Sequence, residues 1–490
     1  MRANTAANVY KFQESTLRAL VLTICLWSAS AFADCTSSST NDGSFDPTWG
    51  NHGCVVFVGD NRGPSTNSQV EKIALTSGSN VFLGGSTSTN SGSWWMGELT
   101  DAGQFDANFG DTDGSGRITG CELFLPGTCP AELYFDFLPQ PDGKILVMSN
   151  TYLTRTSVGG HAFDTTVTGG TGHVPSSFAI STPPGPLLGN LFGALAYSAD
   201  SKLLVAGYGD DSQVASYDLE GIARLSDDLS LDTSFHAVTD SGVTYAGGNF
   251  IATGADAHAH QMLVQSTGKL IVLGSGSGRD IRVTRLNADG SIDSTFGSSG
   301  TTILATPPAP CTSGYYPIVA NRNASIDRAD RIVVTAACSS SLAYDTVVAR
   351  LTADGVLDTA GFGNGGYYVN APFAACGSHQ VLPSATAIDS AGRILVFGSC
   401  DSQVGVQRLR GDGTLDTSFG VNGLASDKFD PSSTGDHPET ILLDRGGRPI
   451  IGGYATLGTR QSAVARLTYD LIYTNDFEAT PRGCLTPNCN

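Results

Sequence analysis

The fold of this chain is decided by a recurring turn, seen most clearly as RLNADGSIDSTFG at residues 285–297. Close copies are RLTADGVLDTAGFG at residues 350–363 and RLRGDGTLDTSFG at residues 408–420. Aligned on the second Asp, and counting one degenerate copy at Asp164, the turns fall at Asp46, Asp106, Asp164, Asp232, Asp293, Asp358 and Asp416. Steps of 58 to 68 residues indicate an array of repeated supersecondary units.

Each unit carries a second landmark, an apolar segment that follows a small or polar turn and ends in Gly or another small residue. Its seven copies begin at Asn80, Lys144, Lys202, Lys269, Arg331, Arg393 and Arg448. A partner strand precedes it, such as ATAID at 385–389, and the strand with the Arg-Leu pair follows. After the Asp turn comes one more short strand, such as CVVF at 54–57. The pattern therefore predicts four short strands in each of seven units.

Four-stranded antiparallel sheets repeated at this period are typical of propeller blades, which bury their faces against one another. We therefore predict an all-β, seven-bladed β-propeller with a period of about 60 residues. The small residues of the landmark strands are interpreted as fitting a crowded centre. The Arg of each Arg-Leu pair is expected to contact a turn Asp, and the Asp side chains to bond their own backbone amides. An open β-solenoid is the alternative, but its repeats are usually much shorter.

The double motif resembles the delta-60 repeat family of bacterial exported proteins over residues 41–468. The resemblance implies a propeller-type repeat and carries no catalytic residue with it. Two units depart from the pattern: HAFDTTV at 161–167 lacks the aromatic-Gly pair, and His236 stands where Gly is expected. We expect irregular blades at these two places.

The N-terminus predicts an export signal. The three basic residues Arg2, Lys11 and Arg18 precede an apolar run at 19–27, and Ala31 and Ala33 form a signal-peptidase site. The run is far shorter than the roughly 20 residues of a membrane span. We predict a signal peptide at 1–33, a lead-in with the first Asp turn at 34–53, the propeller at 54–468 and a tail with a Cys pair at 469–490. This places the protein outside the cytoplasm: secreted, periplasmic or on the cell surface.

Composition limits the partners. The formal net charge is −19, and removing residues 1–33 makes it −21. Such a charge repels nucleic acid and anionic membrane surfaces and suits divalent cations. We expect a monomer with an extracellular ligand, either a glycan or a protein.

The cysteines predict disulfide bonds. Cys25 leaves with the signal, and ten remain, an even number in an oxidising compartment. Two pairs occupy comparable places in their units. These are Cys311–Cys338 and Cys376–Cys400; the remaining neighbours are Cys35–Cys54, Cys121–Cys129 and Cys484–Cys489. Sequence alone does not fix the connectivity.

One loop predicts a metal site. The segment DTDGSGRITGCE at 111–122 fits a Ca²⁺ loop of the EF-hand or dockerin type. The expected ligands are Asp111, Asp113, Ser115, the carbonyl of Arg117, and Glu122, with Gly116 at the sharp turn. No amphipathic helix flanks the loop, so an Asp/Gly-rich surface turn is the alternative. Bound Ca²⁺ would be structural.

Few other residues have the pattern of a catalytic, metal-binding or ligand-binding site. His258 and His260 have the spacing of two metal ligands on a strand, but without a third ligand a surface loop is favoured. The pair Trp94-Trp95 has the chemistry for stacking on a sugar or peptide, but packing between blades is favoured. The sequence holds no Gly-x-Ser-x-Gly, His-Glu-x-x-His or P-loop motif.

The sequence thus favours an exported binding or interaction module. Two alternatives stay open: a polysaccharide lyase or glycosidase, and a structural surface or adhesion protein. Acidic residues gathered at the channel mouth would favour the enzyme, because propeller sites are assembled from separate blades. An aromatic-lined groove would favour the binding module.

Overall fold

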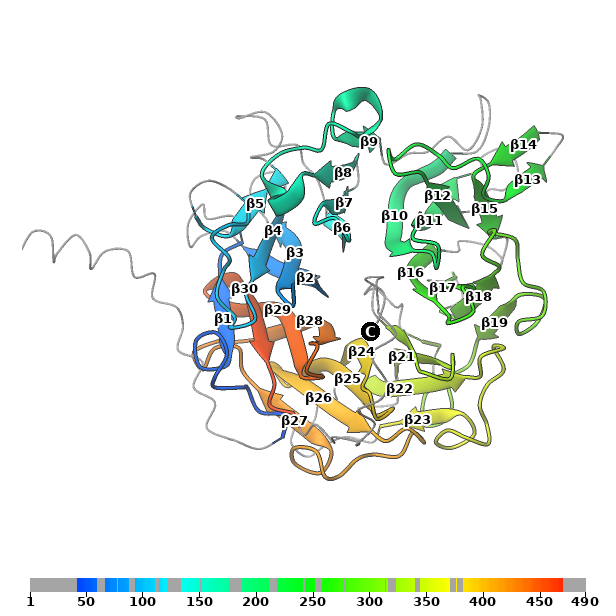
Figure 1. Cartoon of the computed structure of the whole chain (residues 1–490). Helices are drawn as coiled ribbons and strands as arrows, with labels where there is room; N and C mark the ends of the chain where they lie inside the picture. The colour runs from blue at the N-terminus through cyan, green and yellow to red at the C-terminus, as the bar shows by residue number, and fades with distance from the viewer. Residues whose placement is uncertain are drawn as a thin grey trace, which may run out of the picture.

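The chain forms a ring of seven four-stranded antiparallel sheets (Figure 1). The computed structural model describes residues 42–469 except 60–66, 77, 88–92, 111–113, 121–133, 150–151, 176–186, 211–217, 241–242, 252–257, 277–278, 313, 316–322, 340–343, 371–375 and 377–381. The predicted seven-bladed β-propeller is confirmed.

The first strand of each blade lies nearest the ring axis, and these first strands contact one another from blade to blade. From the axis outwards, blade one consists of β2 (Ser68–Leu75), β3 (Val81–Thr87), β4 (Ser93–Leu99) and β5 (Arg117–Thr119), and blade two of β6 (Tyr134–Pro139), β7 (Ile145–Ser149), β8 (Tyr152–Thr156) and β9 (His173–Pro175). Blade three consists of β10 (Leu187–Tyr197), β11 (Leu203–Asp210), β12 (Asp218–Leu225) and β15 (Gly248–Ile251). Blade four consists of β16 (His258–Val264), β17 (Leu270–Ser275), β18 (Ile281–Leu286) and β19 (Thr301–Leu304). Blade five consists of β20 (Ala324–Ile326), β21 (Ile332–Ser339), β22 (Tyr344–Leu351) and β23 (Tyr367–Val369). Blade six consists of β24 (Leu382–Ile388), β25 (Ile394–Cys400), β26 (Gln403–Leu409) and β27 (Leu424–Asp427). Blade seven consists of β28 (Asp436–Leu443), β29 (Pro449–Leu457), β30 (Thr459–Arg466) and β1 (Cys54–Phe57).

The two ends of the propeller close the ring within blade seven. The strand β1 from the N-terminal side pairs with β30 from the C-terminal side, with Cys54 opposite Ala465. The pairing continues beyond these strands, because the amide of Gly43 donates to the carbonyl of Thr468 at 2.8 Å. Closure leaves no free sheet edge between the first and last blades, and a free edge is prone to aggregation.

The hydrophobic core lies between the blades. Ile222 of blade three, for example, shares one buried cluster with Ala259 and Leu270 of blade four. Trp94 and Trp95 are the second and third residues of β4 and are at most 1% exposed. Their predicted packing between blades is confirmed, and stacking on a ligand is excluded by their burial.

In six of the repeated turns, the Arg and the second Asp form an ion pair that links neighbouring blades, and we call this pair the clasp. Arg408 is an example. Its guanidinium is bonded to Asp416 of its own turn at 2.8 Å. It also lies over the ring of Phe419, 4.7 Å from the centroid. The same guanidinium reaches Asp42, on the segment leading to blade seven, at 2.8 Å. The predicted contact between the Arg of the Arg-Leu pair and the turn Asp is confirmed in five turns, by pairs 224–232, 285–293, 350–358, 408–416 and 466–46. In blade two, Arg155 precedes Thr156 and makes the same contact with Asp164.

The Asp side chains also order their own turns. One oxygen of Asp46 accepts from the amide of Thr48 at 3.0 Å, and Asp293 does the same with Thr295 at 3.1 Å. This is the predicted Asx-type bonding. The paired Asp residues of the motif therefore have a structural role.

Three details differ from the predictions or refine them. Blade three is irregular as expected, because a hairpin of β13 (Ala237–Asp240) and β14 (Val243–Ala246) is inserted after His236. Blade two keeps four strands, and two short 3-10 helices, η1 (Val158–Gly160) and η2 (Thr168–Gly170), occupy its turn region. The surface loop predicted for His258 and His260 is wrong, since both belong to β16, where blade three covers the strand.

The reason given for the small residues of the landmark strands is also wrong. These strands are second from the axis, so they do not line its centre. A Cβ on Gly85 would overlap the carbonyl of Gln69, and a Cβ on Gly453 would overlap that of His437. The innermost strand comes too close at these points for a side chain on the second strand.

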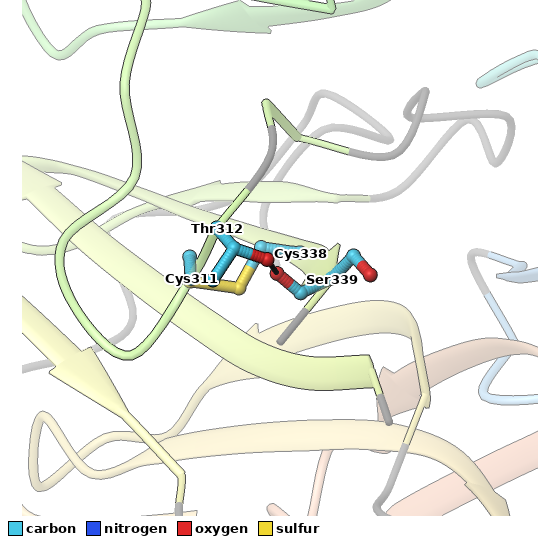
Figure 2. Close-up of a disulfide and its surroundings, with 4 residues drawn as sticks. All are labelled: Cys311, Thr312, Cys338 and Ser339. Carbon is cyan, nitrogen blue, oxygen red and sulfur yellow. Dashed lines mark hydrogen bonds between the residues drawn. A yellow bond between two sulfur atoms is a disulfide. The ribbon is translucent and has the colours of Figure 1, made fainter. Parts of the chain in front are cut away.

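Two disulfides tie inter-blade segments to blades five and six. Cys311 is bonded to Cys338 and Cys376 to Cys400, with Cα–Cα distances of 5.7 and 5.1 Å. Both predicted pairs are confirmed. Figure 2 shows that the hydroxyl of Thr312, next to Cys311, also donates to the carbonyl of Ser339, at 3.2 Å. Cys54 is disulfide-bonded as well; the Cys35 expected to pair with it lies outside the described residues.

Candidate functional site: the axial carboxylates

The two faces of the ring are built differently. One face, here called the turn face, carries the Asp turns, six of which contain the same Arg–Asp pair and one of which also holds the hairpin of β13 and β14. The opposite face, here called the loop face, carries the connections between blades and those between the second and third strands. The connections between blades differ in length, for example residues 428–435 and residues 305–323. Cys338 and Cys400 end second strands on this face, so both disulfides fasten its connections.

β-Bulges at equivalent places in the innermost strands place polar residues beside the axis. The pairing of β2 with β3 skips Glu71, and the pairing of β28 with β29 skips Glu439. The same irregularity occurs at His260 and Ser384 in blades four and six. A bulge re-aims the side chain of the extra residue. Because blade one adjoins blade seven, the bulges bring Glu71 and Glu439 into neighbouring strands.

Glu71 is held toward the loop face. One of its carboxylate oxygens accepts from the side-chain amide of Gln69 at 2.8 Å and from the hydroxyl of Ser86. Ser86 lies near the end of β3, where the chain reaches the loop face. In blade four, His260 is bonded in the same way to Ser275, at 2.8 Å. The bulge residues therefore gather at the loop-face end of the axis.

The charge of Glu71 acts on the carboxyl group of Glu439. Burial, with a smaller contribution from the charge of Glu71, raises the pKa of Glu439 to about 7, against the opposing effect of Arg460. Burial also raises the pKa of Glu71, although the bonds from Ser86 and Gln69 oppose the shift. The pair therefore retains protons at a higher pH than free carboxyl groups do.

A second group from blade seven borders these carboxyls. His437 stacks on the ring of Tyr454 with centroids 4.8 Å apart, and Arg460 lies 4.9 Å from the centroid of that ring. Burial and the charge of Arg460 lower the pKa of His437, so its imidazole tends to be neutral. We call Glu71, Glu439, His437, Tyr454 and Arg460 the axial cluster. It combines a proton donor, hydrogen-bond acceptors, an aromatic face and a cation.

The predicted calcium ligands fall partly outside the described residues. Asp111, Asp113 and Glu122 are not described, so the predicted ligand set is not tested. Gly116 and Arg117 have a role in the blade itself, since Arg117 begins β5 and Gly116 accepts from the amide of Glu98 at 3.2 Å. Within the described ranges, no three His, Cys, Asp or Glu residues are placed to hold a metal ion.

Blade one differs from the others at its clasp. Glu98 occupies the place of the clasp Arg, and Asn80 that of the Lys or Arg at the start of the landmark strand. Asn80 donates to Glu98 at 2.9 Å and to Asp106 at 3.4 Å. Burial and the charge of Asp106 raise the pKa of Glu98. This turn therefore has two carboxyl groups where the other six each have an Arg–Asp pair.

Sequence reasoning missed Glu71 and Glu439. Each Glu lies fourteen residues before the second Gly of a Gly-Gly pair, Gly85 or Gly453. This shared position in the first and last units was a usable signal, because ring closure makes those units neighbours.

Comparison with known sequences supports a propeller repeat. A family profile described as "Domain of unknown function (DUF5122) beta-propeller" matches residues 198–235, 265–296 and 392–419. These segments contain the Asp turns of blades three, four and six. The profile supports a β-propeller repeat family, and the delta-60 resemblance stays a prediction. No curated protein matches the sequence.

Several solved structures are similar in outline. A catalytically inactive virginiamycin B lyase from Staphylococcus aureus is 10% identical, with 84% of this chain and 98% of the lyase covered and a TM-score of 0.45. Semaphorin 1a from Drosophila is 10% identical over 84% and 87% of the two chains, with a TM-score of 0.41. The WD40 domain of Neurospora crassa Pan2 is 8% identical over 83% and 90%, with a TM-score of 0.40. At these values the similarities assign no function.

The described residues contain no helix with the length and apolar character that a membrane span requires. The disulfides of blades five and six are compatible with an extracellular location, where such bonds persist.

Proposed function

We propose that this protein is an exported binding module that holds an extracellular glycan or protein on its loop face. The contrast between the two faces supports this most directly. The turn face repeats the same Arg–Asp pair in six blades, whereas the loop face carries connections of varied length, two disulfides and the axial cluster. Loops on a rigid scaffold are where binding residues are concentrated in proteins, and the disulfides reduce the ordering cost of binding.

The test is a binding screen with the mature chain, using glycan arrays and displayed peptides. For any probe bound, Glu71→Gln and Glu439→Gln should weaken binding at least tenfold, an effect of about 1.4 kcal/mol. Asp142→Asn is the control, because Asp142 lies on the turn face with its side chain 56% exposed. If the control variant binds a probe more weakly and the axial variants do not, that probe binds on the turn face and not on the loop face.

Cleavage of a polysaccharide is a second function, favoured by the raised pKa of Glu439. General acid catalysis needs a group that still carries a proton near neutral pH, and a second carboxylate can activate water or attack the sugar. Incubation with a panel of acidic and neutral polysaccharides should then release reducing ends. Glu439→Gln should lower the rate by about 10²–10⁴. Binding without product formation would leave only the binding function.

Calcium binding at residues 111–122 is the third part of the proposal. Glu98 and Asp106 add negative charge next to the loop, which favours a divalent cation there. Affinities of about 10⁻⁴–10⁻³ M are usual for extracellular modules. At free Ca²⁺ a hundredfold above Kd, binding should stabilise the fold by about 2.7 kcal/mol.

Calorimetric titration with Ca²⁺ and thermal melting with and without chelator test this expectation. Asp113→Ala should abolish both the heat and the shift, whereas Asp101→Ala, on the exposed turn of the same blade, should change neither. Identical melting of the wild type in Ca²⁺ and in chelator, with no titration heat, would identify the loop as an ordinary turn.

A further inference from the structure

Glu220 is a buried carboxyl at the seam between blades three and four. It lies on β12 four residues before Arg224, and side chains two apart on a strand share a face. Ile222, between them on that face, packs against blade four. The described residues at the equivalent place in other blades do not ionise at ordinary pH. They are Trp94, Ile281, Thr346, Val404 and Ser462.

The carboxyl is isolated within this seam. Glu220 is 0% exposed, and neither of its side-chain oxygens has a hydrogen-bond partner in the described part of the chain. The charged groups that act on it from blade four are Arg282 on β18 and Asp280 just before that strand. Arg282 is bonded to Asp280 through Nε and Nη2, each at 3.2 Å. Its charge is thus largely compensated by Asp280.

The protonation state of Glu220 should therefore control how closely blades three and four pack at this seam. A neutral carboxyl is tolerated in such a place far better than an unpaired carboxylate, which needs water or a counter-ion. Once ionised, Glu220 can be compensated only if Arg282 leaves Asp280 or if water enters between the blades. Either response disturbs the contact between β12 and blade four.

We propose that Glu220 is a proton-dependent latch, which keeps blades three and four closed while it is protonated and loosens this one seam when it ionises. The other seams lack a carboxyl at this place, so they should not respond in the same way. A ring that opens at a defined seam changes the spacing of the loop-face connections on both sides of it. The latch is independent of the proposed ligand.

The direction of the pH dependence follows from the shift of the pKa. Burial, with a smaller effect of Asp280, raises the pKa of Glu220 from 4.5 to about 8, against the attraction of Arg282. The folded state therefore holds a proton that the unfolded state has lost. The stabilisation is fully present below pH 4.5 and is lost as the pH rises through about 8.

Hydrogen exchange of the mature, oxidised chain at pH 6, 7, 8 and 9 tests the proposal, with rates corrected for intrinsic exchange. Amides of β12, β16 and β18 should lose at least tenfold in protection between pH 6 and pH 9. Amides of β21 and β25 should stay within about threefold. Glu220→Gln should remove the response at the seam. Glu98→Gln, which changes a carboxyl at another seam, should retain it when measured in chelator.

Two results would overturn the latch. One is wild-type protection at β12 and β16 that does not change up to pH 9. The other is a pH response that persists in Glu220→Gln. If that variant does not fold, Glu220→Met provides an apolar side chain of similar size, and the wild-type profile decides independently of any variant.

Discussion

Replacing Arg408 by Ala should lower the free energy of unfolding by about 3–5 kcal/mol, the usual effect of breaking a buried ion pair. The side chain of Arg408 is 2% exposed, and its guanidinium bridges Asp416 and Asp42, both at 2.8 Å. Its loss leaves one carboxylate without its buried partner and exposes the ring of Phe419, over which the guanidinium lies. It also removes a contact to the segment that closes the ring. Urea denaturation followed by tryptophan fluorescence and by circular dichroism measures the change.

Arg410 is the matched control for this prediction. It lies two residues further on and approaches the same Asp416 at 3.6 Å, but its side chain is 51% exposed. Exposed ion pairs contribute about 0–1 kcal/mol, so Arg410→Ala should have a small effect. Arg408→Lys should fall between the two, because an ammonium group keeps the charge and loses the planar fork. Equal losses for the two alanine variants would show that the clasp does not hold the blades together.

The architecture of this protein was predictable because its signals are local and repeated. The Asp turn recurs at a fixed step, and each Arg lies eight residues before its Asp partner in most copies, for example Arg285 and Asp293. Neighbouring cysteines such as Cys376 and Cys400 also occupy equivalent places in successive units. These relations join residues that are close in the sequence, so they do not depend on how the blades are arranged relative to one another. The strand count, the ion pairs and two disulfides therefore followed from the sequence.

The axial cluster was not predicted, because it depends on two features without a local signal. A bulge inserts one residue into an innermost strand, and nothing in the residues around Glu71 or Glu439 announces it. Ring closure then joins the first and last units, which are the most distant in the sequence. Blade one is a different case, because the presence of Glu98 in place of Arg can be read directly from the sequence. Its significance appeared only when the six Arg–Asp clasps established what that position does.

Replacing Gly413 by Ala should be markedly more destabilising than the same change at Gly392. Both glycines have positive φ, 80° and 77°, so the left-handed conformation penalises Ala by about 1–2 kcal/mol at each. A Cβ at Gly413 would lie 2.7 Å from the ring of Phe362 and 2.9 Å from the amide nitrogen of Gly363, both in the preceding blade, whereas a Cβ at Gly392 has nothing within 4 Å. Overpacking in a core adds about 1–3 kcal/mol, so Gly413→Ala should lose that much more.

The difference between these two variants isolates the contact between blades five and six, because the backbone penalty is common to both. Phe362 is 1% exposed and lies beneath Arg350, 4.7 Å from the guanidinium, so its ring has little freedom to move aside. Phe362→Leu should make room on the side of the ring and reduce the loss from Gly413→Ala, while the contact with the amide nitrogen of Gly363 remains; a double-mutant cycle measures this coupling. An unchanged loss in the Phe362→Leu background would mean that the turn itself, and not the neighbouring ring, requires glycine. Coupling would show that the Asp-Gly turn keeps its glycine to admit the aromatic residue of the blade before it.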